Sequence, residues 1–212
     1  QAPVEDQSNP IALLDAVCVS SHRLQTPTLG ILVACDSGID QAYVDALAAQ
    51  GRLFGGKNMQ GARPGEVAAA LLFADAAQSV LMGEGPFPSL HRASWGSREK
   101  SADERGRVSA ELLGRLVGLA LEASKIDALK ILLVSADHDH NSSRESELAE
   151  LLTEKFPELD VVKDAVKVAQ ACGSMHQVTT TAALCLAHQY AVDEQLPVLC
   201  TSLHDPHWRA AV

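Results

Sequence analysis

The stretch that decides the fold is LGILVACDSGID at residues 29–40, together with PGEVAAALLFA at residues 64–74. The first contains a continuous apolar run, 29–35, which ends at Asp36, Ser37 and Gly38. Short apolar runs bounded by turn residues are typical of strands buried on both faces. The sequence therefore predicts such a strand at 29–35 and a second strand at 66–74.

Similar runs return further along the chain and predict buried strands at 128–136 and 196–203, with a short strand near 159–166. Between them, the sequence predicts helices at about 40–50, 109–124, 145–156 and 176–192. Strands that alternate with helices indicate an α/β fold whose sheet is covered on both faces. The last helix is rich in Ala and Thr, and these small side chains allow close packing between layers.

Composition restricts the class of protein. The 212 residues are 47% hydrophobic and 21% charged, which is typical of one core or two small lobes and excludes disorder and collagen. The formal net charge of −10 argues against a nucleic-acid partner, because phosphate binding needs clustered Lys and Arg. No run reaches 18 apolar residues, so no transmembrane helix is predicted.

The cysteines indicate a reducing compartment. Their number is odd and no C-x-x-C motif occurs; they are Cys18, Cys35, Cys172, Cys185 and Cys200. The N-terminal residues have neither the basic nor the apolar part of a signal peptide. We expect a cytoplasmic protein; a leader or membrane anchor removed upstream of Gln1 is the alternative.

Two polar loops follow predicted strands: Asp-His-Asp-His at 137–140 and His-Asp-Pro-His at 204–207. If the carboxyl ends of their strands meet, these side chains could hold zinc. Neither H-E-x-x-H nor C-x-x-C supports that hypothesis, and two solvated loops are the favoured interpretation. We therefore predict no metal. The glycines at 37–38, 55–56 and 173–174 fit turns better than a phosphate cradle, so we predict no cofactor.

Cys172 is a candidate nucleophile because it lies four residues before His176, near the start of a predicted helix. A helix dipole at that end lowers the pKa of a thiol. The competing interpretation is a small core residue, which a free Cys usually is, and the sequence favours it. Cys18 near His22 is a weaker instance of the same pair.

The order of these segments resembles the thiolase-like superfamily, and its β-ketoacyl synthases most of all. The most specific part is Pro64-Gly65-Glu66 leading into AAALLF, after the Gly38-Ile39-Asp40 that follows strand 29–35. GSMHQVTTTAALCLA at 173–187 resembles the synthase segment in which Gly-His precedes a small-residue helix. The resemblance covers residues 29–212.

This resemblance implies a layered α/β/α/β/α fold with mixed sheets, of which the chain holds only part. Residues 1–28 would be a lead-in and the remainder of the first half, 29–85 the end of that half, and 86–212 the second half. Synthases are about twice as long, so either the chain is a fragment or a second piece completes the fold.

The departures from the synthase pattern concern catalysis. Condensing enzymes of this type use a Cys at a buried helix start and two His residues. The nucleophile would fall near residues 5–12, where no Cys occurs. The first His would fall near Ala136 and Asp137, one step from His138, whereas His176 matches the second. Any surviving activity would therefore use His176, Cys172 and His138.

We accordingly expect a non-catalytic thiolase-like domain that serves as a protein-binding scaffold or adaptor. The chain also resembles bacterial secretion accessory proteins, among them adaptors of type VI lipase effectors. The alternatives are a β-ketoacyl synthase whose nucleophilic Cys lies outside this chain, and a metal-dependent hydrolase. A protein partner is expected, and a homodimer is a further possibility.

The spacing of acidic residues on the predicted helix at 145–156 suggests where a partner binds. Glu147, Glu150 and Glu154 fall three or four residues apart and predict a mostly acidic face. Such a face is usually a solvated helix surface. The functional hypothesis is an electrostatic docking face for a basic partner, which would act mainly on the association rate.

Overall fold

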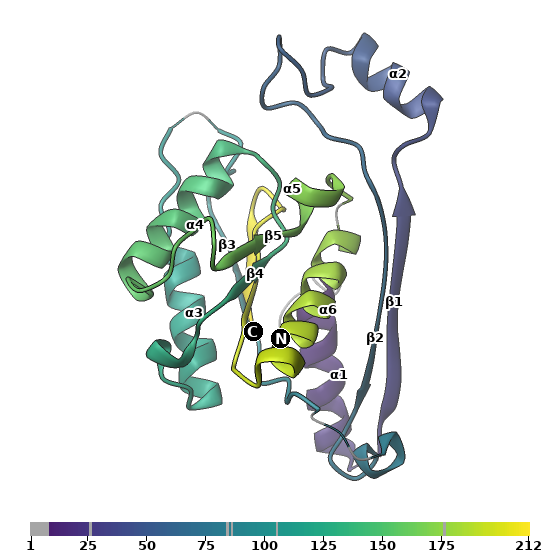
Figure 1. The fold of residues 1–212 in the computed structure, drawn as a ribbon, viewed down its shortest axis with the longest axis vertical. Coiled ribbons are helices and arrows are strands. Elements are labelled where there is room, and N and C mark those ends of the chain that lie inside the picture. The colour runs from purple at the N-terminus through teal and green to yellow at the C-terminus, as the bar shows by residue number, and fades with distance from the viewer. Residues whose placement is uncertain (1–8, 26, 84, 86, 105, 176) are drawn as a thin grey trace.

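Two sheets and the helices beside them form four layers, seen edge-on in Figure 1. The computed structural model describes residues 9–25, 27–83, 85, 87–104, 106–175 and 177–212. In chain order the elements are α1 (Pro10–Leu24), β1 (Leu29–Ser37), α2 (Gln41–Ala49), β2 (Glu66–Ala74), η2 (Ser79–Met82), β3 (Ser94–Ser97), α3 (Glu111–Ser124), η3 (Ala128–Lys130), β4 (Val134–Ala136), α4 (Ser142–Lys155), β5 (Ala165–Lys167), α5 (Val168–Cys172), α6 (Gln177–Glu194), β6 (Leu199–Ser202) and β7 (Trp208–Ala211).

The first sheet is a two-stranded antiparallel ribbon of β1 and β2, which we call the ribbon. Its register runs from Leu29 opposite Ala74 to Ser37 opposite Glu66. Because side chains alternate between the faces of a strand, Leu32, Leu71 and Phe73 point inward and pack in a core cluster that includes residues of α6. In Figure 1 the ribbon is the outermost layer, and α2 lies beyond its end.

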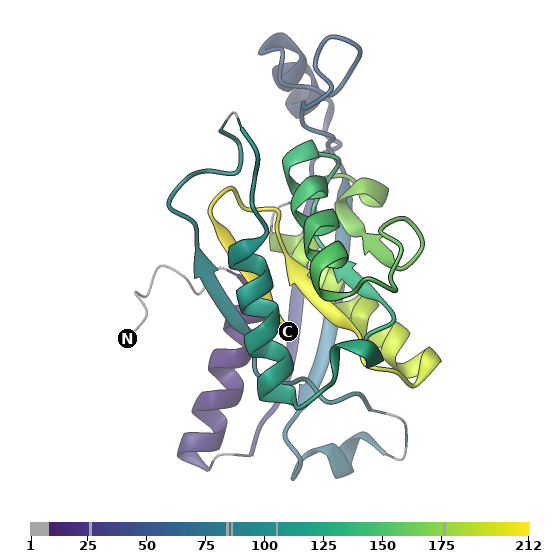
Figure 2. The same ribbon diagram turned by 90° about the vertical axis from the view of Figure 1, so that its left-hand side faces the viewer.

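The second sheet has five strands in the order β3-β7-β6-β4-β5. β4 is parallel to β5 and β6, whereas β7 is antiparallel to β6 and β3, so the sheet is mixed. Helices α3 and α4 cover one face, in the foreground of Figure 2. Helices α1 and α6 cover the other face, so the second sheet has a helix layer on each side.

Helix α6 lies between the two sheets and contacts strands of both. Several of its buried residues are small or of medium size: Thr179, Thr180, Thr181 and Ala183. These side chains let two sheets approach the same helix closely. The prediction of a mixed, layered α/β fold with a helix at about 176–192 buried between layers is confirmed.

The strand predicted at 128–136 is wrong over its first half. The Asp127 side chain accepts a hydrogen bond from the Leu129 amide and starts the 3-10 turn η3, so only β4 is extended. The strand predicted at 159–166 is similarly shortened. Asp160 accepts hydrogen bonds from the amides of Val162 and Lys163 in a turn, and β5 begins at Ala165.

Residues 11–18 belong to a longer helix than their apolar run indicates. Asn9 caps α1, Pro10 occupies its first turn, and Gln25 ends it in the left-handed conformation with φ of 52°. No helix in the described part of the chain is long and apolar enough to cross a membrane.

The outer face of the ribbon departs from the sequence prediction. The apolar run at 29–35 predicts a strand buried on both faces, but Ile31 and Val33 are each 65% exposed. Only the inner face is covered by α6 in the part of the chain that the structure describes. Among the described residues, the outer face of the ribbon is therefore open to solvent.

Candidate functional site

Asp137 is the centre of a buried polar cluster at the ends of β4 and β6. Its Oδ2 accepts hydrogen bonds from the hydroxyls of Thr180 and Ser202, at 2.6 Å each, and lies 2.8 Å from Nδ1 of His204. Its Oδ1 accepts from the backbone amides of Leu203 and His204, at 2.7 and 3.1 Å. We call these residues the Asp137 hub. The five contacts join two strands, the following loop and helix α6.

The topology explains why these residues meet. β4 and β6 are parallel neighbours, so the residues that follow them emerge at the same edge of the sheet. Thr180 comes from the first turns of α6, which crosses this edge. The favoured interpretation of 137–140 and 204–207 as two solvated loops is wrong at Asp137, which is fully buried and contacts His204 directly.

The hub contains a charged pair. Burial alone would raise the pKa of Asp137, but the charge of His204 and the hydrogen bonds from His204, Ser202 and Thr180 hold it well below the ordinary 3.8. For His204, burial lowers the pKa, but the charge and hydrogen bond of Asp137 outweigh it and raise the value above 6.5. Each group thus favours the ionised form of the other.

The geometry of this pair sets the chemistry that it can perform. Because Asp137 holds Nδ1, the other ring nitrogen of His204, Nε2, is the one left for acid–base work. The hydroxyls of Ser202 and Thr180 donate to Asp137 instead. Within the described residues, no hydroxyl or thiol is hydrogen-bonded to Nε2, so the hub lacks the nucleophile–base contact of covalent catalysis.

Asn9 precedes helix α1 and lies within residues 5–12, where the synthase resemblance places the nucleophile. Its Oδ1 accepts a hydrogen bond from the Ile11 amide, at 2.9 Å, and so caps α1. Its Nδ2 donates to Ser202 Oγ, at 3.1 Å, which ties the helix start to the Asp137 hub. An amide is no nucleophile, and the first cysteine of the chain is Cys18, in the middle of α1.

The thiols of Cys172, Cys185 and Cys200 are not activated. Cys172 lies at the end of the short helix α5 instead of at a helix start, and its Sγ is 3.1 Å from the carbonyl of Val168. Burial raises the pKa of Cys172, and burial likewise raises the pKa of Cys185 and Cys200. A raised pKa leaves these thiols protonated at neutral pH. His176, the proposed partner of Cys172, lies outside the described residues.

His138 is fully buried beside Glu145 and away from the hub contacts. Its Nε2 is 3.5 Å from Oε1 of Glu145, whose other oxygen pairs with Lys167 Nζ at 2.9 Å. Nearby, His140 packs edge-on against the ring of Phe54. Among the residues that the structure describes, no group of three His, Cys, Asp or Glu side chains could hold a metal ion.

Glu147 belongs to the interior, so the expected docking face needs correction at this position. Arg209, also fully buried, donates two hydrogen bonds to the two oxygens of Glu147, at 2.9 and 2.8 Å. Arg98 adds a third at 3.1 Å. Glu150 pairs with the exposed Arg107 at 3.0 Å, and Glu154 is exposed. Only the last two can therefore face a partner.

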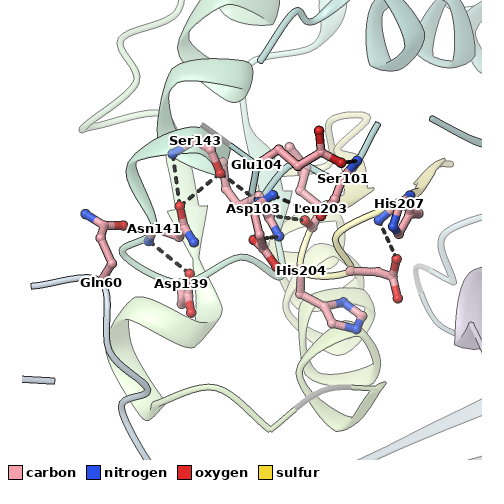
Figure 3. Close-up of polar contacts among 12 residues, drawn as sticks. Gln60, Ser101, Asp103, Glu104, Asp139, Asn141, Ser143, Leu203, His204 and His207 are labelled. Carbon is pink, nitrogen blue, oxygen red and sulfur yellow. Dashed lines mark hydrogen bonds and ion pairs between the residues drawn. The ribbon is translucent and has the colours of Figure 1, made fainter. Parts of the chain in front are cut away.

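The start of α4 borders a polar hollow of about 710 Å³. Asn141 caps the helix by accepting from the Ser143 amide, and Gln60 accepts from the Ser142 amide. Figure 3 shows this turn, with Gln60 on one side and Asp103 on the other. The hollow carries charges of both signs, from Asp103, Glu104 and Arg107, so it favours no single class of ligand.

Comparison with solved structures identifies the fold. No protein-family model and no curated protein matches the sequence. Among solved structures, AntDE:AntF, a type II acyl-carrier protein in complex with its ketosynthase, matches with a TM-score of 0.69 and 10% identity over 95% of this chain and 59% of that one. The ishigamide ketosynthase/chain length factor matches at 0.63 and 14%, over 91% and 55%. The 3-oxoacyl-[acyl-carrier-protein] synthase III of Aquifex aeolicus matches at 0.57 and 12%, over 96% and 63%.

These likenesses show that the chain has the thiolase-like fold of the ketosynthases, as the order of sequence segments predicts. The chain spans little more than half the length of these structures. About four tenths of each, therefore, has no counterpart in the 212 residues.

Proposed function

We propose that this chain is a thiolase-like protein-binding domain that does not condense acyl groups through a cysteine. The observation that carries the proposal is the hydrogen bonding of Asn9. Its side chain caps α1 and contacts Ser202 of the Asp137 hub, and it lies within residues 5–12, where the synthase resemblance places the thiol and no Cys occurs. Without a nucleophile the acyl-thioester intermediate has no point of attachment.

The hub supports the same proposal. A catalytic carboxylate–histidine pair directs its imidazole at a nucleophile, whereas both hydroxyls near this pair donate to the carboxylate. Five contacts to one buried carboxylate hold β4, β6 and α6 together. The Asp137 hub thereby acts as a structural anchor, and the proposed binding function uses the surface.

The test uses thiol-directed ketosynthase ligands. The purified chain is incubated with acyl-CoA or with cerulenin and its intact mass is measured, with a cerulenin-binding ketosynthase as positive control. We expect no stoichiometric adduct on this chain and a full adduct on the control. A single adduct mapped to Cys172 would overturn the proposal.

The alternative condensing enzyme, whose nucleophilic Cys lies outside these 212 residues, is separated by the same reagents. It predicts that a protein that includes the segment upstream of Gln1 takes the adduct on a Cys of that segment. The resemblance to adaptors of type VI lipase effectors names one class of partner. It remains a prediction, which identification of the partner tests.

A further inference from the structure

We draw no further inference here: the strongest candidate, the polar hollow at the start of α4 between Gln60 and Asp103, rests on a helix N-terminus whose amides Gln60 and Asn141 already cap, and no buried side chain without a hydrogen-bond partner lies among its described lining residues.

Discussion

The two sheets of this molecule begin from similar apolar strands but differ in what surrounds them. The five-stranded sheet has α3 and α4 on one face and α1 and α6 on the other. At its strand ends, buried charges are paired, as Asp137 is with His204 and Glu147 with Arg209. The ribbon shares α6 on its inner face but leaves Ile31 and Val33 in solvent.

This difference distinguishes the buried contacts that stabilise the fold from the exposed apolar surface of the ribbon. Buried ion pairs are costly to disrupt because the charge left behind loses both water and its counter-ion. Exposed apolar side chains contribute little to the stability of the isolated chain but become valuable when covered. We therefore expect substitutions of the buried pairs in the five-stranded sheet to lower stability more than substitutions on the outer face of the ribbon.

The largest effect is expected from Glu147→Ala. The fully buried Arg209 loses its bidentate carboxylate, and breaking such a pair costs about 3–5 kcal/mol. Urea unfolding monitored by circular dichroism measures the loss. Replacing both partners, as in E147L/R209M, should recover much of it. If E147A unfolds like wild type, the Arg209–Glu147 pair does not anchor this sheet.

Asp137→Asn is expected to cause the second-largest loss of stability. The amide keeps one acceptor oxygen for the Leu203 and His204 amides but loses the charge that faces His204 and two hydroxyls. Hydrogen bonds to a charged group contribute about 1.5–3 kcal/mol, so we expect a loss of that order. Thr180→Val removes one hydroxyl donor and should cost less. Equal losses from both variants would contradict the central role given to the carboxylate.

The sequence predicts much of the fold because its signals are local. The apolar run at 66–74 coincides with β2, and the run at 29–35 lies within β1. The strand order in the five-stranded sheet depends on pairing between residues far apart, such as Ser94 and Ala211, and no local pattern encodes it. The sequence does not predict the 3-10 turn that Asp127 starts, because the apolar residues around it match the pattern of a strand.

The candidate site was predictable only as two polar loops. Their contact through Asp137 and His204, 67 residues apart, follows from the parallel pairing of β4 and β6. Glu147 illustrates the limit of helical spacing. It shares the spacing of Glu150 and Glu154, but Arg209, 62 residues later, makes it an interior residue. The spacing of residues shows which side chains share one face of a helix, but it does not show which other element packs against that face.

A matched pair on one strand compares the two faces of the ribbon directly. Leu32→Ala removes a side chain that packs against the α6 core cluster and should cost about 2 kcal/mol. Ile31→Ala, one residue away on the outer face, should cost less than about 1 kcal/mol in the isolated chain. Thermal unfolding of the two variants measures the difference. Similar losses would mean that the outer face is already covered.

The Asp137 hub predicts a pH dependence of stability. Because the folded pKa of His204 is raised above 6.5, its contribution is fully present below pH 6.5 and is lost as the pH rises through the folded value. The lowered pKa of Asp137 acts oppositely, and its contribution is lost only as the pH falls below 3.8 towards the folded value. The unfolding free energy should therefore decline from pH 6 to pH 8 in wild type. It should change less in His204→Gln, and parallel profiles would contradict the pairing.

The smallest effect on stability is expected from charge reversal on the exposed part of α4. Glu150 pairs with Arg107, whose side chain is 81% exposed, and exposed pairs contribute about 0.2–1 kcal/mol. The double variant E150K/E154K should therefore melt within a few degrees of wild type. If a partner docks on this exposed part of α4, its charges mainly change the association rate and are screened by salt. Binding kinetics at low and high salt test this, because E150K/E154K should leave the association rate unchanged at both salt concentrations if the partner docks elsewhere. A slower association in E150K/E154K at low salt that disappears at high salt would place the partner on α4.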